Sequence, residues 1–272
     1  MSKTQNILFI GITIIAVSSI YIIYDLTQER PEMDISSSKL IDLTHTFSNN
    51  TIYWPTEKSG FVLDTQFEGI TDNGFYYSQK MFAAPEHGGT HMDAPIHFYK
   101  DGITVEQIPI EQLIAKAIVV DITTKNNPDY QLTISDIISW ESQHGMIPQD
   151  SIILVKTGWA KYWPDREAYL GTSQLGSEAV PLLHFPGVAP QTSKWLTENR
   201  EISAIGIDTA SIDYGQSTLF ETHQILSSKN IPIFENVAIT DELPVKDFHV
   251  IALPVKIDGG SGAPLRIVAI VS

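Results

Sequence analysis

Short runs rich in Ile, Val, Phe and Tyr alternate with a few helical stretches along the chain. β-branched and aromatic residues favour strands. The runs predict strands over residues 39–43, 61–67, 75–82, 117–122, 151–156, 204–207, 231–234, 249–253 and 266–271. The run 151–156 (SIILVK) is apolar at four consecutive positions, which is typical of a buried strand.

Two stretches predict helices instead. Ile134, Ile137 and Ile138 share one helical face, and Gly145 stands where a helix ends, which predicts a helix over 135–144. Pro190 suits the first turn of a second helix, over 190–200. Because strands and helices do not alternate strictly, the order predicts a mixed α/β fold rather than a doubly wound parallel sheet.

The N-terminal residues 7–24 carry no charge. As a helix rising about 1.5 Å per residue, this run spans roughly 27 Å, close to the thickness of a bilayer core. It predicts a transmembrane anchor or signal segment over 1–24, a polar linker over 25–38 and one folded domain over 39–272. Lys3 precedes the run and acidic residues follow it, which favours a membrane-anchored protein with its domain outside the cytoplasm, periplasmic or extracellular. A cleaved signal, giving a secreted protein, is the second choice, and a buried core helix is the third.

Composition narrows the function classes. The 272 residues are 43% hydrophobic, which excludes a disordered chain, and the net charge of −15 argues against a nucleic-acid partner. There is no cysteine, so disulfides, thiolate metal sites and cysteine nucleophiles are excluded. Any metal must be held by nitrogen and oxygen. No G-x-G-x-x-G motif follows a strand, which argues against nucleotide binding.

One segment concentrates groups that can bind metal or move protons. Four of them fall within 11 residues: His87, His91, Asp93 and His97. All four stand at odd-numbered positions, and this even spacing projects them to one side of an extended chain, but a straight strand would spread them over roughly 30 Å. Gly88, Gly89 and Pro95 provide bends that can gather them.

The residue types favour a metal centre over hydrogen-bonded turn residues. Two neutral imidazoles and a carboxylate leave coordination positions open for water, as in a catalytic zinc or manganese site. A bound cation lowers the pKa of its water and polarises a carbonyl. His97 would remain to move protons, which imidazole does near pH 7.

The segment resembles the signature H-x-G-T-H-x-D-x-P-x-H of the cyclase family of metal-dependent hydrolases, which includes kynurenine formamidase (arylformamidase) and isatin hydrolase. Residues 87–97 match every specified position. The similarity continues through 41–44, 53–55, 206–209, 235–237 and 251–254, and so covers the chain from about Leu40 to the C-terminus. The resemblance implies a swivelling β/β/α domain with a barrel-like central mixed sheet, usually as a homo-oligomer, a dimer or larger.

By this resemblance His87, His91 and Asp93 hold a first divalent metal, zinc or manganese, and His97 is the general acid and base. In the formamidase branch a later His and Glu hold a second metal, with the Asp as a bridge. His223 and Glu235 occupy the matching places. The isatin hydrolase branch looks mononuclear, so one or two ions per chain remain open.

The expected reaction is attack of activated water on the C–N amide bond of a small aromatic formamide or amide. The alternatives are ring opening of a lactam or imide, as in isatin hydrolase, and non-catalytic binding of small molecules by a membrane-tethered protein. Trp54 and His184 are the candidate substrate contacts, although a structural role is favoured for His184 in its Pro/Gly-rich loop. Asp208 and Asp213 are interpreted as turn residues rather than as supports of the metal ligands.

Overall fold

The computed structural model describes residues 35–271. Its main sheet has eight strands in the order β1-β12-β11-β5-β7-β9-β10-β4. They are β1 (Lys39–Asp42), β4 (His91–Asp93), β5 (Ile114–Asp121), β7 (Ser151–Lys156), β9 (Ile202–Ile207), β10 (Ile233–Glu235), β11 (Phe248–Pro254) and β12 (Gly262–Val271). Because β4 pairs with β12 as well as with β10, seven of these strands close into a barrel, and β1 lies along β12 outside the ring.

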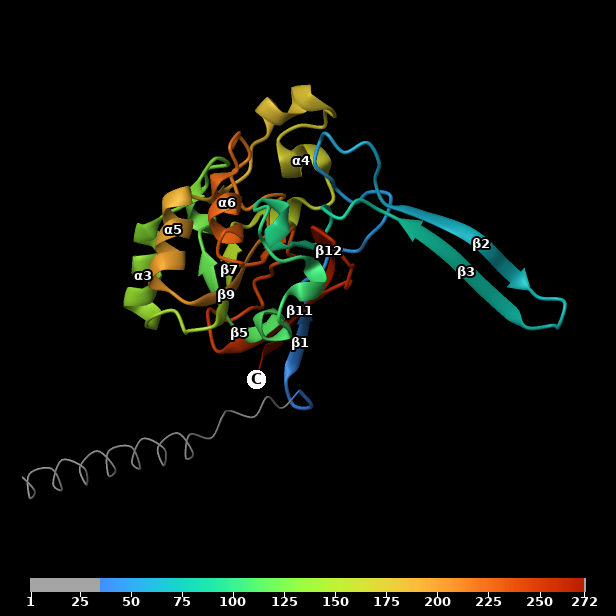
Figure 1. Cartoon of the computed structure of the whole chain (residues 1–272), viewed down its shortest axis with the longest axis horizontal. Helices are drawn as coiled ribbons and strands as arrows, with labels where there is room; N and C mark the ends of the chain where they lie inside the picture. The colour runs from blue at the N-terminus through green and yellow to red at the C-terminus, as the bar shows by residue number, and fades with distance from the viewer. Residues whose placement is uncertain (1–34, 272) are drawn as a thin grey trace, which may run out of the picture. The chain divides into compact units, whose positions relative to one another are not determined.

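Strands β5, β7, β9 and β10 pair in parallel, and the other pairings of the barrel are antiparallel. Three helices cover the outer face of the parallel part: α3 (Ile134–His144), α5 (Pro190–Asn199) and α6 (Glu221–Ser227) (Figure 1). On β7, Ile152 and Leu154 point into the barrel, while Ile153 and Val155 face these helices. The strand is therefore buried on both faces, which explains its unbroken apolar run.

Shorter elements connect the barrel strands. The short helices are α2 (Ile110–Leu113) and α4 (Arg166–Leu170), and the strands β6 (Gln131–Leu132) and β8 (Gly187–Val188) form a separate parallel pair. The 3₁₀ turns are η1 (Pro95–His97), η2 (Val105–Gln107), η3 (Thr123–Lys125), η4 (Trp159–Tyr162) and η5 (Ser177–Leu182).

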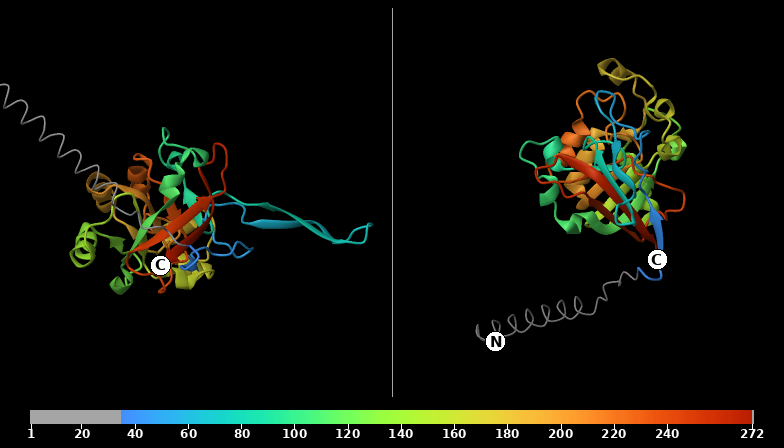
Figure 2. Two further views of the ribbon diagram at one scale, coloured as in Figure 1. Left: turned by 90° about the horizontal axis from the view of Figure 1, so that it is seen from below. Right: turned by 90° about the vertical axis from the view of Figure 1, so that its right-hand side faces the viewer.

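Strands β2 (Val62–Ile70) and β3 (Tyr76–Ala83) form an antiparallel hairpin outside the barrel. We call this hairpin the arm. It projects well away from the barrel in two perpendicular views (Figures 1 and 2). Both strands were expected from their apolar runs, and both are confirmed, but neither joins the main sheet.

The predicted fold class is confirmed as mixed α/β with a barrel-like sheet, and the predicted strands and helices are present, β7 with its predicted ends and the others with shifted ends. The face predicted for α3 is partly wrong. Ile138 is 52% exposed, whereas Ile137 and Trp140 are buried. Trp140 lies three residues beyond Ile137 and so shares its face, and its indole N–H donates to the carbonyl of Val119 on β5.

The predicted membrane anchoring is corrected. A bilayer core requires a helix of about 20 apolar residues. Across residues 35–271 the longest α-helix is α3, with 11 residues, and none could span a membrane. The run 7–24 lies outside the described residues. With no such helix in the described part of the chain, the predicted membrane-anchored location with a periplasmic or extracellular domain is not supported.

Asp136 at the start of α3 gives a test of stability against pH. Thr133 and Asp136 form a reciprocal capping box, and Lys125 pairs with the Asp136 carboxylate at 2.8 Å. Burial alone would raise the pKa of Asp136, but hydrogen bonds from Lys125, Thr133 and Tyr130 lower it to about 2. Because the folded pKa is depressed, the stabilisation is present above about pH 4 and is lost as the pH falls through 2.

We expect Asp136→Ala to lower the free energy of unfolding by about 1 kcal/mol at pH 7, the usual cost of losing a cap. The difference from wild type should shrink between pH 4 and pH 2. Urea unfolding at several pH values measures it, with Ser135→Ala in the same turn as the matched control. A difference that stays constant over this range would contradict the assignment.

Candidate metal centre

The segment 87–97 is bent at the predicted places. Gly89 has a φ of +59°, and a Cβ there would lie 2.6 Å from the Phe47 ring, so only glycine fits. The chain then enters the short strand β4, where His91 and Asp93 project to the same side because they are two residues apart. Pro95 begins the turn η1, which ends at His97. The bends therefore keep these groups close together instead of spread along a straight strand.

Strand pairing brings Glu235 to the same place. β4 pairs with β10 in antiparallel register, with His91 opposite Glu235. Directly opposed residues in a sheet project to the same face at a Cβ separation of about 5 Å. The carboxylate of Glu235 is also held in place by the backbone N–H of Ile212, which donates to it at 2.7 Å.

His223 reaches the site from the first turn of α6. This helix follows Phe220, whose φ is +50°, and no side chain of its N-cap residue closes it. Asp213, which lies outside the helix, caps its start instead: the Asp213 carboxylate accepts hydrogen bonds from the backbone N–H groups of Thr222 and His223. The same carboxylate contacts His223 Nδ1 at 2.7 Å, which fixes the ring with Nε2 toward β4 and β10.

Four buried side chains thus converge at the end of the barrel: His91, Asp93, His223 and Glu235. His223 Nε2 lies 3.2 Å from Asp93 Oδ2 and 3.1 Å from Glu235 Oε1. His91 Nε2 lies 3.2 Å from Asp93 Oδ1 and 3.6 Å from Glu235 Oε2. His91 Nδ1 contacts the carbonyl of Gly89 at 2.9 Å, so Nε2 is the nitrogen left for a ligand.

The carboxylate charges in this group favour a cation bound between the side chains. Burial alone would lower the pKa of His91 and of His223, but the neighbouring carboxylates raise the pKa of His91 and raise that of His223 well above its usual range. Burial would likewise raise the pKa of Asp93, yet the surrounding imidazoles hold it well below its usual range. Each Nε2 faces carboxylate oxygens, so the space between them suits a proton or a metal ion. Nitrogen and oxygen donors of this kind fit Zn²⁺ or Mn²⁺.

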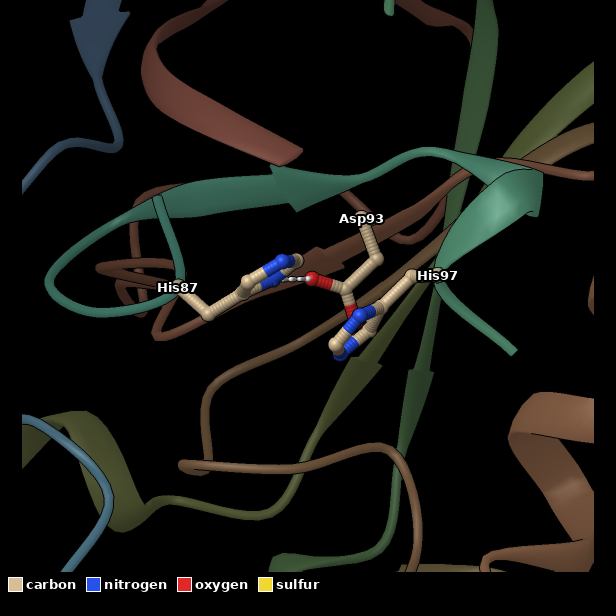
Figure 3. A group of neighbouring side chains, drawn as sticks. All are labelled: His87, Asp93 and His97. Atoms are coloured by element: carbon tan, nitrogen blue, oxygen red, sulfur yellow. Dashed lines mark hydrogen bonds and ion pairs between the residues drawn. The ribbon is translucent and has the colours of Figure 1, made fainter. Parts of the chain in front are cut away.

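His87 and His97 also lie beside Asp93 (Figure 3). His87 Nδ1 lies 2.6 Å from Asp93 Oδ1, and His87 Nε2 lies 2.9 Å from the hydroxyl of Ser261. The rings of His87 and His97 stack with centroids 3.7 Å apart. Two sets of donor atoms are close enough to hold an ion, His87 with Asp93 and His97, and His91 with Asp93 and Glu235. Asp93 belongs to both.

Burial is the largest of the effects that lower the pKa of His97 to about 4; Asp93 opposes it, and the nearby imidazoles add to it. His97 is therefore neutral near pH 7 and can accept a proton. Its ring also packs edge-on against Phe98, with centroids 4.5 Å apart. The side chain is thus held beside Asp93 while part of it stays open to solvent.

Aromatic rings wall the pocket above these groups. The cavity is about 180 Å³, and the aromatic residues that line it include Trp54, Phe98 and Phe220. The polar side chains described above also line it: His87, His91, Asp93, His97, His223 and Glu235. Trp54 packs edge-on against Phe220, and Phe98 lies over His223 with ring centroids 4.3 Å apart. A flat apolar group fits such walls.

The structure brings all the predicted metal and acid–base residues together and places Trp54 in the same pocket, but it does not bring His184 there. His184 pairs with Asp129 at 2.8 Å and lines a separate groove. Of the two aspartates interpreted as turn residues, Asp208 caps the turn η4, whereas Asp213 supports His223. The sequence pattern allowed this second role but favoured a turn, because Asp213 and His223 meet only through the path of the loop between them.

Asp213 should tune metal affinity without touching the ion. Partners of metal-bound imidazoles typically account for 10- to 100-fold in affinity. We expect Asp213→Asn to weaken zinc or manganese binding by about that factor, measured by competition with a chromophoric chelator. Asp208→Asn is the matched control, since Asp208 is equally buried and also accepts backbone N–H groups. Equal affinities in the two variants would contradict the assignment.

Comparisons with known proteins place the chain among hydrolases. The family model Cyclase, described as "Putative cyclase", matches residues 41–214. Isatin hydrolase of Roseibium aggregatum is 31% identical over 210 residues, covering 73% of this chain and 77% of that protein. Kynurenine formamidase of Salinibacter ruber is 26% identical over 236 residues, covering 84% and 96%.

The fold is similar to solved structures as well. Isatin hydrolase A from Labrenzia aggregata, bound to benzyl benzoate, superposes with a TM-score of 0.77 and 30% identity. The match covers 91% of this chain and 99% of that one.

Proposed function

The chain belongs to the cyclase family of metal-dependent hydrolases, and we propose that it cleaves the C–N bond of a small aromatic formamide or amide in this pocket. The observation that carries the proposal is the convergence of His91, Asp93, His223 and Glu235 beneath aromatic walls, with His97 beside them. A complete set of metal-binding and proton-transfer groups also argues against the alternative of a non-catalytic binding protein.

The position of each residue in the pocket gives it a different role in the reaction. A divalent ion would be held by the buried carboxylates and imidazoles and, when bound, would supply a reactive water and polarise the amide carbonyl. His97, neutral and partly open to solvent, is placed to accept a proton from the attacking water and to return it to the leaving nitrogen. The rings of Trp54, Phe98 and Phe220 orient the substrate and exclude bulk water from the carbonyl carbon.

For the metal we propose zinc or manganese, with two ions per chain. The support is that Asp93 belongs to both donor sets and that Glu235 and His223 complete one of them. Asp93 would then help to hold both ions, and two ions would together stabilise the charge that develops on the attacking and leaving atoms. A single ion per chain after full metal loading would refute the second site and leave the first intact.

A lactam- or imide-opening hydrolase is the second candidate. The observation in its favour is that the isatin hydrolase relative is 31% identical, whereas the kynurenine formamidase relatives are 24% to 27% identical. Both reactions break a C–N bond next to an aromatic ring, so the pocket walls alone do not separate them.

The test is turnover of N-formylkynurenine, isatin and simple cyclic imides by purified protein loaded with zinc or manganese. The main proposal expects the highest kcat/KM for the formamide, and the second candidate expects it for isatin. Metal analysis of the same samples gives the stoichiometry. Stoichiometric metal without turnover of any of these compounds would refute both.

Trp54 should determine substrate affinity rather than rate. An aromatic contact contributes about 0.5–1.5 kcal/mol, so Trp54→Ala should raise KM for an aromatic substrate by about 2- to 10-fold with little change in kcat. Trp195→Ala is the control, because Trp195 packs under Arg200 away from the pocket. An equal effect of Trp54→Ala on a small aliphatic amide would show that the ring does not contact the aromatic group.

A further inference from the structure

His87 lies against a glycine-rich segment that leads into β12, residues 259–262, which we call the GGSG loop. A Cβ at Gly262 would lie 2.4 Å from His87 Cε1 and 2.8 Å from its Nδ1, so only glycine lets the ring come this close to the strand. Gly262 is paired with Asp93 in the register between β12 and β4. The GGSG loop is thus fixed next to the segment that carries the metal-binding residues.

Ser261 is held in the GGSG loop by backbone hydrogen bonds that do not involve His87. Its carbonyl accepts from the N–H of Ala94, the residue after Asp93, at 2.8 Å. Its own N–H donates to Glu86 Oε2 at 3.2 Å. The position of the Ser261 side chain beside His87 is therefore set by the path of the loop.

The Ser261 hydroxyl connects Glu86 to His87. Its Oγ lies 2.6 Å from Glu86 Oε2 and 2.9 Å from His87 Nε2. A hydroxyl has one hydrogen to donate, and a carboxylate can only accept. The hydroxyl therefore donates to Glu86 and accepts from His87, which must carry a hydrogen on Nε2. Because neutral imidazole carries only one such hydrogen, Nδ1 is left with its lone pair free.

This free nitrogen faces the proposed metal centre. His87 Nδ1 lies 2.6 Å from Asp93 Oδ1 (Figure 3). The arrangement is the reverse of that at His91 and His223, where Nδ1 contacts a backbone carbonyl or a carboxylate and Nε2 faces the centre. The three imidazoles are thus held in different tautomers by their outer partners.

Given the metal centre proposed above, on which this inference rests, we propose that Ser261 and Glu86 are positioning residues that keep His87 in the tautomer whose Nδ1 binds the ion. Glu86 acts through the hydroxyl. Without its carboxylate, the Ser261 hydroxyl is free to donate to Nε2 of His87. That hydrogen bond favours the other tautomer, in which a hydrogen occupies Nδ1, the nitrogen that the ion requires.

Zinc affinity tests the connection, measured by competition with a chromophoric chelator. Ser261→Ala should weaken zinc binding by about 10- to 100-fold, and Glu86→Ala by about 10-fold, the range typical of partners of metal-bound imidazoles. The double variant should bind zinc no more weakly than Ser261→Ala alone, because Glu86 acts only through the hydroxyl. A carboxylate that acted simply as a negative charge near the cation would weaken binding again in the double variant.

Two further variants separate this role from general support of the loop. Ser261→Thr keeps a hydroxyl and should retain most of the wild-type affinity. Glu106→Ala is the matched control for Glu86→Ala. Glu106 Oε2 accepts from the N–H of Gly259 in the same loop, at 3.1 Å, but has no hydrogen bond to Ser261 or His87. Its removal should leave zinc affinity near that of wild type.

The zinc-loaded wild type tests the tautomers directly, with no dependence on how a variant folds. Nuclear magnetic resonance of protein labelled with ¹⁵N-histidine shows which ring nitrogen carries a hydrogen. Among His87, His91 and His223, we expect one zinc-bound ring with its hydrogen on Nε2 and two with it on Nδ1.

The possible failures are distinguishable. A hydrogen on Nδ1 in all three zinc-bound rings would overturn the inference and leave the metal centre standing. The same holds if the effect of Glu86→Ala adds in full to that of Ser261→Ala, or if Glu106→Ala weakens binding as much as Glu86→Ala. A wild type that binds no zinc would overturn the metal centre and this inference with it.

Discussion

Asp93→Asn is expected to abolish both metal binding and hydrolysis. Asp93 lies among three imidazoles, with His87 Nδ1 at 2.6 Å and the Nε2 atoms of His91 and His223 at 3.2 Å. These neighbours hold the pKa of Asp93 well below its usual range, so the carboxylate is ionised at neutral pH. Its loss should weaken metal binding by more than the ~100-fold typical of an outer partner. Polarisation by the ion contributes several kcal/mol, so kcat/KM should fall at least about 10³-fold.

Metal content by mass spectrometry and turnover of the best substrate measure this result. Asp72→Asn, in the exposed turn of the arm, makes the same chemical change away from the site and should behave as wild type. If Asp93→Asn kept stoichiometric metal, the carboxylate would not be a ligand and the proposed centre would be wrong.

His97→Ala is expected to lower kcat by about 10²- to 10⁴-fold, the usual contribution of a general acid and base, while metal content stays near that of wild type. The donor set that includes His97 also permits a different role, as a metal ligand with His87 and Asp93. The two roles predict different results: a ligand variant loses metal, whereas a proton-transfer variant keeps it.

His97→Gln sharpens this comparison because glutamine keeps a polar side chain but cannot exchange a proton near neutral pH. It should be as slow as His97→Ala. His249→Ala, on β11, is the control for removing an imidazole elsewhere. Loss of metal in both His97 variants would show that His97 is a metal ligand. Full activity in either variant would show that His97 does not transfer the proton.

Much of the fold follows from local pattern. The buried strand β7 was predicted with its observed ends, because four consecutive apolar residues fit only a strand covered on both sides. The arm strands were predicted as strands but not as an arm. Propensity indicates that a segment is extended, and it contains no information about what packs on its faces. Likewise Ile138 was placed on the wrong side of α3, since neighbouring positions on a helix lie only 100° apart.

The sequence by itself determined the chemistry of the site, because His87, His91, Asp93 and His97 lie within one short segment. Gly89 and Pro95 bend this segment through their own backbone preferences. Site residues that are distant in sequence from this segment could not be predicted from local pattern. Glu235 was expected only through family resemblance, and the tertiary structure explains it by the register that sets it opposite His91.

Asp213 was interpreted as a turn residue, and the tertiary structure places it against His223 instead. His184 was named as a candidate substrate contact with a structural role favoured, and the structure pairs it with Asp129. The physical reason is that local spacing fixes the direction of side chains within a few residues, whereas contacts between distant segments depend on strand pairing and loop paths that only the folded chain defines.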